Sequence, residues 1–413
     1  MLFGQRKQKA GKKFFLSFAG WNRYEILYLV IQKRRRHKPL SQRWKEPDGF
    51  QWSTFTNEDG AAVRYGHVSP KDKKDIKGTV AILPGFRETA EKYHETVQDF
   101  LDRGYSVYVM DWRGQGGSDH YLPHDPQKSH SEGFDAQVRD LDHFISKVVK
   151  PVKDKPLLLA AHSMGAHLSL RYLKEHPGMI DGAMLTAPML DIKTGALPKH
   201  IARTLAKHAV SSGKGEKYIP GGKDWQETAF ADNKLTHDET RHNLGQDIMK
   251  NNVHLQTGDP TYRWVHEAFK SMDIVNDESY LRSIDTPILL ASAGQDETVD
   301  VPPQDRAAKM LPRCTQVSFP DARHEIWMET DDIRSDWLAK CDTFLTQFDN
   351  KKKLARDFDK NARKNEDWKG AHPPTPHGPR PRHIEDDSLP GQGQDNGGDD
   401  KPSSSFNNRR FGI

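Results

Sequence analysis

Short apolar runs alternate with helical stretches between residues 47 and 350, and this rhythm constrains the fold more than any other feature. Each run has the length of one strand and is apolar throughout, as expected for strands covered on both faces. Strands that alternate with helices form parallel sheets through right-handed crossovers. Strands are predicted at 79–83, 106–110, 157–160, 183–186, 288–292 and 316–319, and helices at 90–103, 135–149, 164–176 and 303–311.

Two further segments complete the predicted α/β domain of residues 47–350. Residues 51–56 and 62–68 flank a turn with Asp59-Gly60, which predicts a hairpin. Between about 191 and 285 the pattern is helical, for example at 197–210, with no strong strand. An insertion late in an open α/β sheet is expected to cover the carboxyl ends of the strands, where ligands bind. We interpret it as a helical lid over a mostly parallel sheet with helices on both faces.

The N-terminal segment, residues 1–46, carries a net charge of +11, which leaves −10 on residues 47–350. An acidic domain is not typical of nucleic-acid binding, so no nucleic-acid partner is expected. The apolar runs at 14–21 and 26–31 are too short for a transmembrane helix, which needs about 20 residues. Two interpretations stay open: peripheral contact with an anionic membrane, or a helix packed on the domain with its basic end in solvent.

Composition also indicates the order of the C-terminal segment and the cellular compartment of the protein. Residues 351–413 are rich in Pro, Gly and Ser and poor in aliphatic residues, so a disordered tail is predicted. Two cysteines, Cys314 and Cys341, exclude a disulfide scaffold and a multi-cysteine zinc site. They suit a reducing compartment, so we expect a cytoplasmic protein, with the inner membrane face as the place of any peripheral contact.

The strand predicted at 157–160 runs into Ala161-His162-Ser163-Met164-Gly165 and then into a helix. Small residues on both sides of a serine, at a tight turn from strand to helix, are typical of a nucleophile elbow. Taken alone, the same pattern also fits a helix N-cap. Ser163 is therefore the candidate nucleophile.

A nucleophilic serine needs a base and an orienting acid, which in such folds follow it in the order Asp, then His. Asp296 lies on the loop after the strand at 288–292, and His324 on the loop after the strand at 316–319. Both loops leave the same edge of the sheet as Ser163. Asp300 competes with Asp296 for the acid role, but Asp296 follows its strand more closely.

The chemistry also needs two N–H donors for the developing oxyanion. The sequence indicates the backbone amides of Met164, directly after the nucleophile, and of Phe86, where Gly85 allows close backbone approach. An ordinary β-turn at 84–88 is the alternative. His120, His124 and His130 lie on a polar loop and are interpreted as solvated, so no metal and no cofactor is expected.

These residues resemble the serine-hydrolase branch of the α/β-hydrolase fold, close to monoacylglycerol lipases and bacterial lysophospholipases. The resemblance covers residues 47–348 and implies an inserted lid and a Ser–Asp–His triad. It differs from the usual pattern at Pro84, where the family has His, and at Ala161, where it has Gly. Its segments are Asp59-Gly60, Arg64-Tyr65-Gly66, Pro84-Gly85-Phe86-Arg87-Glu88 with Tyr93, Asp111-Trp112-Arg113-Gly114-Gln115-Gly116-Gly117-Ser118, the elbow, Ala187-Pro188-Met189, Leu235-Thr236-His237-Asp238, Gly294-Gln295-Asp296 and Ala322-Arg323-His324-Glu325.

The resemblance implies an esterase that forms an acyl-enzyme at Ser163 and acts on monoacyl lipids, either lysophospholipids or monoacylglycerols. A carboxylesterase for small soluble esters and a non-catalytic binding protein are the alternatives. Dehalogenase and epoxide-hydrolase chemistry is disfavoured, because those enzymes have Asp at the elbow. Asp111 and Arg113 are expected to form an ion pair that braces the loops beside the oxyanion donors.

Overall fold

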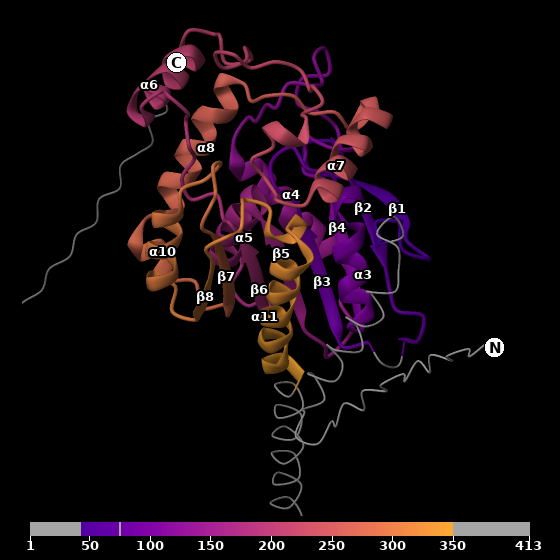
Figure 1. Cartoon of the computed structure of the whole chain (residues 1–413). Coiled ribbons are helices and arrows are strands. Elements are labelled where there is room, and N and C mark those ends of the chain that lie inside the picture. The colour runs from indigo at the N-terminus through magenta and orange to yellow at the C-terminus, as the bar shows by residue number, and fades with distance from the viewer. Residues whose placement is uncertain (1–42, 74–75, 350–413) are drawn as a thin grey trace, which may run out of the picture. The chain divides into compact units, whose positions relative to one another are not determined.

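The computed structural model describes residues 43–73 and 76–349. Nearly all of the predicted N-terminal segment and the whole predicted tail lie outside these residues, so both remain predictions. The described residues form one eight-stranded sheet in the order β1-β2-β4-β3-β5-β6-β7-β8 (Figure 1). The strands are β1 (Gln51–Thr56), β2 (Ala62–Val68), β3 (Gly78–Leu83), β4 (Tyr105–Met110), β5 (Leu157–His162), β6 (Gly182–Thr186), β7 (Ile288–Ala293) and β8 (Cys314–Phe319).

The sheet is antiparallel at the β1 end and parallel from β4 to β8. The predicted hairpin forms β1 and β2, and β2 pairs antiparallel with β4. From there β4, β3, β5, β6, β7 and β8 pair in parallel with their neighbours. All residues of β3 to β7 are buried, which explains why these strands are apolar without alternation. The predicted α/β-hydrolase fold is confirmed.

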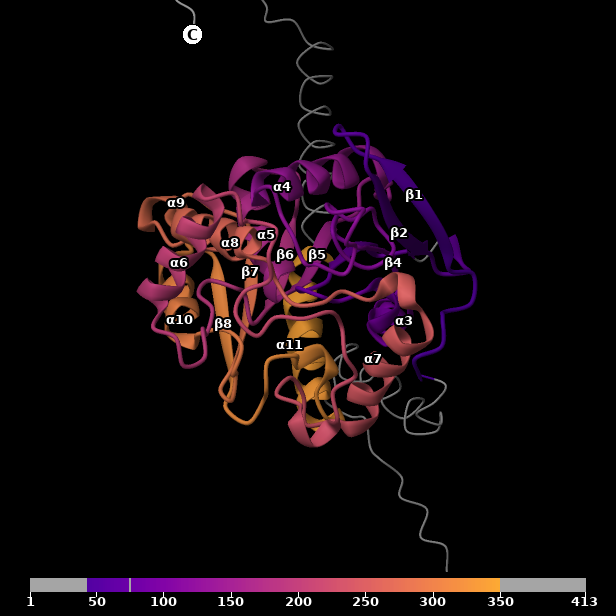
Figure 2. The same cartoon turned by 90° about the horizontal axis from the view of Figure 1, so that it is seen from above.

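Helices cover both faces of the sheet (Figure 2). Successive residues of a strand point to opposite faces, so β3 contributes Val80 and Ile82 to one core and Ala81 and Leu83 to the other. Helices α3 and α11 pack on the first core, and α4, α5 and α10 on the second. Their bounds are α3 (His94–Asp102), α4 (Phe134–His143), α5 (Ser163–Glu175), α10 (Val301–Met310) and α11 (Asp331–Asp349).

The segment 191–285 contains α6 (Lys199–Ser211), α7 (Glu239–Asn251), α8 (Tyr262–Val275) and α9 (Glu278–Arg282). We call this segment the insert, and the rest of the described residues the body. The 3₁₀ turns Phe230–Asp232 and Val253–Leu255 also belong to the insert. Helices α6 and α7 lie at one end of the sheet, at the top of Figure 1. Among the described residues no helix has the length and apolar character needed to span a membrane.

The bounds of the predicted elements differ from the structure by only one or two residues, but two predicted helices contain a turn of another helix type. The helix predicted at 135–149 is α4 followed by a π-helical turn, Phe144–Val148. The helix predicted at 90–103 begins as a 3₁₀ turn, Ala90–Tyr93, before α3. Apolar periodicity does not distinguish an α-helix from these tighter or wider turns, since all three can bury the same side chains.

Candidate active site

Ser163 lies where β5 ends and α5 begins, and its backbone is strained. Its φ angle is +51°, in the left-handed region that residues other than glycine rarely adopt. The turn is tight because α5 starts against the end of β3: a Cβ at Gly165 would lie 2.3 Å from the Leu83 carbonyl oxygen. The small residue two positions after the serine is therefore required by close packing.

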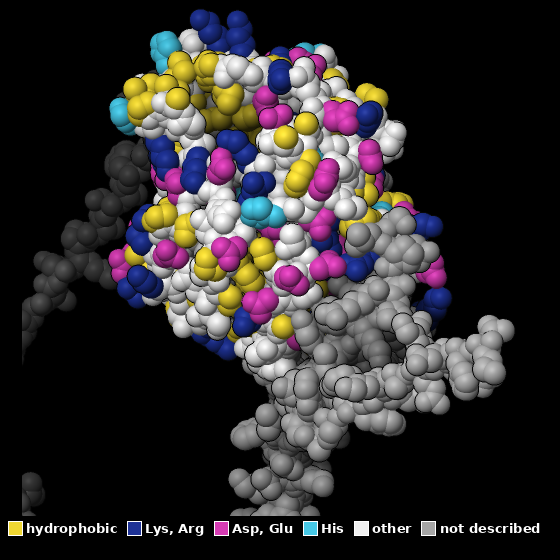
Figure 3. Space-filling model, viewed as in Figure 1, with side chains coloured by type: hydrophobic (Ala, Val, Ile, Leu, Met, Phe, Trp, Pro, Cys, Tyr) yellow, Lys and Arg dark blue, Asp and Glu magenta, His cyan; other side chains and the backbone are white. Residues whose placement is uncertain are grey.

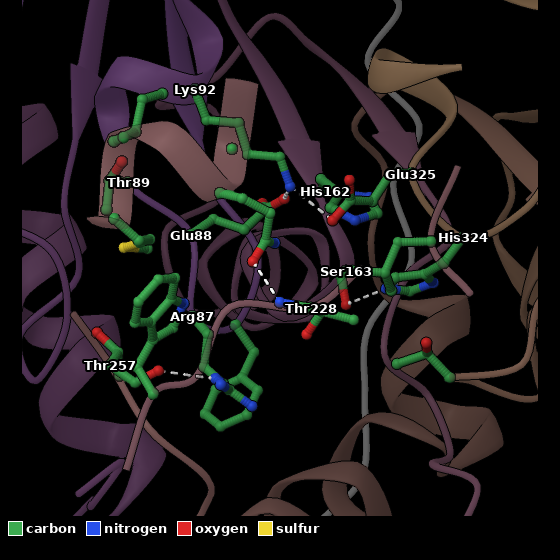
Figure 4. A pocket seen from close by; sticks show the side chains of 18 of the residues that line it. Arg87, Glu88, Thr89, Lys92, His162, Ser163, Thr228, Thr257, His324 and Glu325 are labelled. Atoms are coloured by element: carbon green, nitrogen blue, oxygen red, sulfur yellow. Dashed lines mark hydrogen bonds and ion pairs between the residues drawn. The ribbon is translucent and has the colours of Figure 1, made fainter. Parts of the chain in front are cut away.

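The structure brings Asp296 and His324 to Ser163. Figure 4 shows His324 next to Ser163. His324 Nε2 lies 3.0 Å from Ser163 Oγ, and His324 Nδ1 lies 2.6 Å from Asp296 Oδ2. All three side chains are at least 95% buried. A serine hydroxyl bonded to an imidazole, with a carboxylate on the far ring nitrogen, is the arrangement that activates a serine nucleophile.

Asp296 accepts hydrogen bonds on both oxygens, which keeps it ionised. Its Oδ1 accepts the backbone N–H groups of Thr298 at 2.8 Å and Val299 at 2.9 Å. Burial raises the pKa of this carboxyl, but the His324 ring and these N–H groups outweigh burial and hold the pKa below its ordinary value. Asp300, the competing acid, instead pairs with Lys199 of the insert.

The loop 84–88 lies beside Ser163. A Cβ at Gly85 would lie 2.8 Å from Glu88 Oε2, 3.0 Å from His162 Cδ2 and 3.2 Å from Ser163 Cβ, so a larger residue here would have to displace these side chains. Phe86 lines the same cavity as Ser163. Arg87 has a φ angle of +61°, and its guanidinium reaches the insert, at 2.9 Å from the Thr257 carbonyl oxygen and 2.7 Å from Asp259.

The structure contains a buried cluster of charged residues next to this loop that the sequence analysis does not predict. Lys92 Nζ lies 2.8 Å from Glu88 and 2.6 Å from Glu325, and Tyr93 donates to Glu88 at 2.6 Å. Burial alone would raise the pKa of Glu88, but Lys92 and His162 lower it to about 2. The spacing of Glu88 and Lys92, four residues apart, and the place of Glu325 next to His324 are the signals that could have pointed to this cluster.

The predicted ion pair between Asp111 and Arg113 is wrong. Asp111 binds Arg64 of β2, with the Nε–Oδ2 distance at 2.6 Å. Arg113 binds Asp140 of α4 at 2.5 and 2.7 Å, and also Asp59. Closeness in sequence does not decide the partner here, because Asp111 binds a residue of β2 and Arg113 binds a residue of α4.

The cysteines and the loop histidines named in the sequence analysis are not part of the cavity at Ser163. Cys341 is buried and Cys314 is partly buried, each as a free thiol. His120 lies against the Pro126 carbonyl oxygen and His130 against Thr261. Within residues 43–73 and 76–349, no group of three or more His, Cys, Asp or Glu side chains is arranged to hold a metal ion.

A cavity of about 380 Å³ opens at Ser163, with walls from both parts of the molecule. The body contributes one wall and the insert the other. The body residues include Phe86, Arg87, Glu88, Lys92, His162, Ser163, His324 and Glu325; the insert residues include Trp225, Thr228, Leu235, Gln246, Ile248, Met249 and Thr257. The triad-like residues thus face a chamber whose outer wall is made largely by the insert.

Comparison with known proteins identifies the family. Residues 74–331 match the family model described as serine aminopeptidase, S33. The chain belongs to this family of hydrolases. It is similar to lysophospholipase L2 of Escherichia coli, with 31% identity over 309 residues, or 72% of this chain and 87% of the relative. It is also similar to a probable lysophospholipase L2 of Haemophilus influenzae, with 29% identity over 68% of this chain and 88% of the relative.

Solved structures of the same fold agree with this assignment. A soluble variant of monoglyceride lipase from Saccharomyces cerevisiae aligns with a TM-score of 0.58 and 20% identity, covering 72% of this chain and 94% of that one. At that identity the likeness supports the fold alone. Together with the family match and the sequence relatives, it confirms the predicted resemblance. The chain is an S33-family serine hydrolase of the carboxylic-ester class.

Proposed function

We propose that this protein hydrolyses the ester of monoacyl lipids, with Ser163 as nucleophile, His324 as base and Asp296 as orienting acid. The observation that carries the proposal is the chain of hydrogen bonds from Ser163 through His324 to Asp296, at 3.0 and 2.6 Å, inside the cavity. Ser163 Oγ attacks the ester carbonyl while His324 Nε2 takes its proton. The same proton then goes to the departing alcohol, and the acyl group stays on Ser163.

The oxyanion of the tetrahedral intermediate is bound by the backbone N–H groups of Phe86 and Met164. Met164 is the second residue of α5, where backbone N–H groups have no partner within the helix. A water then attacks the acyl-enzyme, with His324 as base again, and releases the fatty acid. Asp296 holds the ring in the required tautomer and stabilises the imidazolium.

Monoacyl lipids are the substrate class that the cavity and the relatives favour. Leu235, Ile248 and Met249 give the insert wall an apolar surface suited to an acyl chain. The sequence relatives bear the name lysophospholipase, and a further relative from Mycolicibacterium smegmatis bears the name monoacylglycerol lipase. The head group is therefore glycerol or a glycerophosphoryl group.

The test is fatty-acid release from a monoacylglycerol and from a lysophospholipid with the same acyl chain. Ser163→Ala serves as the blank, and its turnover should fall by about four to six orders of magnitude. Release of fatty acid by the wild type alone supports the proposal. Release by Ser163→Ala would overturn the assignment of the nucleophile, and cleavage of short nitrophenyl esters alone would favour a carboxylesterase for small esters.

The lipid substrate also motivates a role for residues 1–46, which we propose contact an anionic membrane at the cytoplasmic face. The four consecutive cations from Lys33 to Arg36 carry this part of the proposal. Full-length protein should co-sediment with vesicles that contain an anionic lipid, and salt should weaken the binding. Replacing the four cations by Gln should reduce the bound fraction, whereas replacing Arg409 and Arg410 should not. Equal binding to neutral vesicles would contradict an electrostatic contact.

A further inference from the structure

Buried side chains bind the backbone of the loop 84–88, which follows β3. The Trp112 indole donates to the Pro84 carbonyl oxygen at 2.8 Å. Glu88 Oε2 accepts the Gly85 N–H at 2.5 Å. Proline therefore suits position 84 although it has no side-chain donor, because the loop is held through its carbonyl and through the carboxylate of Glu88.

Gln115, from the loop after β4, makes three hydrogen bonds to the same short loop. Its Nε2 donates to the carbonyl oxygens of Gly85 at 2.7 Å and Glu88 at 2.9 Å. Its Oε1 accepts the Arg87 N–H at 3.1 Å. A primary amide has two N–H donors and one carbonyl acceptor, so every polar atom of this side chain serves the loop. Gln115 is 97% buried, and it is not among the residues that line the cavity.

These bonds determine the direction of one particular N–H group. The Gly85 carbonyl and the Phe86 N–H belong to the same planar trans peptide, so they point in opposite directions. Because Gln115 holds the carbonyl, it also aims the N–H of Phe86. The N–H groups of Gly85 and Arg87 each have an acceptor, whereas the hydrogen bonds found in the described part of the chain include none from the Phe86 N–H. This donor is left free beside Ser163.

We propose that Gln115 is a positioning residue that aligns the Phe86 N–H with the oxyanion. The inference rests on the proposed function, since it needs Phe86 to be an oxyanion donor. Gln115 does not contact Ser163 or the cavity, so it acts through the loop. Its loss should therefore weaken stabilisation of the transition state and leave binding of the intact substrate unchanged.

The test uses Gln115→Met, which keeps the length of the side chain and removes its hydrogen bonds. Loss of a whole oxyanion donor costs about 100- to 1,000-fold in kcat, so a misaligned donor should cost roughly 10- to 100-fold, with KM unchanged. Affinity for a trifluoromethyl ketone analogue, which forms an oxyanion with the serine, should fall by the same factor. Affinity for an unreactive ether analogue should stay the same.

The matched control is Gln304→Met. Gln304 is fully buried in α10, and its amide donates to the Pro188 carbonyl oxygen at 3.3 Å, away from the loop 84–88. It should keep the kcat of the wild type. Active sites are counted with a fluorophosphonate so that kcat refers to folded protein alone. A variant that only disturbs folding would lower the number of sites and leave kcat per site unchanged, which would overturn the inference.

A second variant, Gln115→Glu, keeps the acceptor for Arg87 and loses both N–H donors. It should lose at least as much kcat as Gln115→Met, and wild-type kcat in it would overturn the inference. Ser163→Ala distinguishes a failure of the proposed function from a failure of the positioning role of Gln115. Activity in Ser163→Ala would refute the proposed function, whereas an inactive Ser163→Ala together with normal kcat in Gln115→Met would refute the positioning role alone.

Discussion

The body and the insert differ in how they are held together. Body strands β3 to β7 are buried at every residue, whereas α6 has only Ala206 and Ala209 buried. Most of the exposed large apolar side chains in the described residues belong to the insert: Ile201, Leu205, Val253 and Ile274, against Met179 of the body. Figure 3 shows apolar side chains gathered around a hollow at the upper left, the side on which Figure 1 draws α6.

Because of this difference, we expect the body to hold the proposed triad and the insert to determine which substrates fit the cavity. Ser163, Asp296 and His324 all belong to the body, whose close packing holds the three side chains of the proposed triad within hydrogen-bond distance of one another. The insert supplies much of the apolar wall. It is joined to the body by α8, whose Trp264, Ala268 and Phe269 pack in the core that contains α4 and α5, and by polar contacts such as those of Arg87 and Arg241. Changes in the body should therefore affect the chemical step, and changes in the insert should affect substrate choice and local stability.

The sharpest contrast lies between two aspartates of one loop. Asp296 faces His324 of the body, and Asp300 faces Lys199 of the insert. Asp296→Asn should lower kcat by about 10⁴-fold, because the amide favours the wrong imidazole tautomer. Asp300→Asn is the control and should keep most of the activity. Steady-state kinetics on one ester compare the two, and an equal loss in both would remove the distinction between body and insert.

Arg241 tests how strongly the insert is anchored. It is fully buried at the start of α7, and binds Glu95 at 2.9 and 3.0 Å and Asp331 at 2.7 Å. Arg241→Met should lower the free energy of unfolding by about 1.5–3 kcal/mol, because the buried Glu95 loses two charge-assisted hydrogen bonds but keeps Arg334 at 3.4 Å and Trp44 at 2.9 Å.

The control for this change lies on α6. Arg203 pairs with Asp273, and both side chains are more than a third exposed, so Arg203→Met should cost no more than about 1 kcal/mol. Urea unfolding measures both variants. Both residues of this pair belong to the insert, so similar losses would show that Arg241 stabilises the protein no more than an exposed ion pair within the insert does.

Met249 tests the proposed acyl wall. It lines the cavity from α7, and Met249→Ser should lower kcat/KM for a long acyl ester relative to a short one by roughly tenfold. Ile201→Ser on α6 removes an exposed apolar side chain outside this wall and should leave the ratio unchanged. Hydrolysis of a series of esters of increasing chain length gives the ratio. An unchanged ratio in Met249→Ser would place the acyl chain elsewhere.

The smallest expected effect concerns a buried histidine of the body. Burial, with a smaller contribution from Arg171, lowers the pKa of His167 to about 3, so this ring stays neutral in the folded state. Below about pH 6.5 the unfolded chain takes up a proton here that the folded protein does not. The free energy of unfolding should therefore fall as pH falls from 6.5 toward 3, by roughly 1 kcal/mol over the first unit.

His167→Gln removes this contribution and should flatten the dependence of unfolding free energy on pH. His208→Gln, at an exposed position of α6, should leave the dependence as it is in the wild type. Urea unfolding at several pH values between 4.5 and 7 gives the slopes. An identical slope in wild type and His167→Gln would show that other groups account for the pH dependence.

The body was largely predictable from the sequence, because buried parallel strands are continuous apolar runs and the loops after them carry the reactive side chains. The sequence favours Asp296 over Asp300 only because Asp296 lies nearer its strand; in the structure Asp296 contacts His324 and Asp300 contacts Lys199. Helix α6, predicted from residue 197, begins after Pro198, since proline is tolerated at a helix start and not inside it.

The polar interior was not predictable in the same way. Charged residues are normally exposed, so the spacing of Glu88 and Lys92 indicates a contact between them but not that both are buried with Glu325. Asp111 and Arg113 were paired wrongly because their true partners lie on β2 and α4, far away in sequence. Such choices depend on tertiary distances that a single sequence does not contain.

Arg87 has a consequence for how such an enzyme can change its substrates. It stands in a strained conformation directly after Phe86, and its guanidinium is held by Thr257 and Asp259 of the insert. A chimaera that kept this body and took its insert from another hydrolase would leave that cation without its acceptors, next to the loop proposed to bind the oxyanion. The insert is thus not a freely exchangeable module. New specificities can be built into α7, but a transplant must carry a replacement for Thr257 and Asp259 with it.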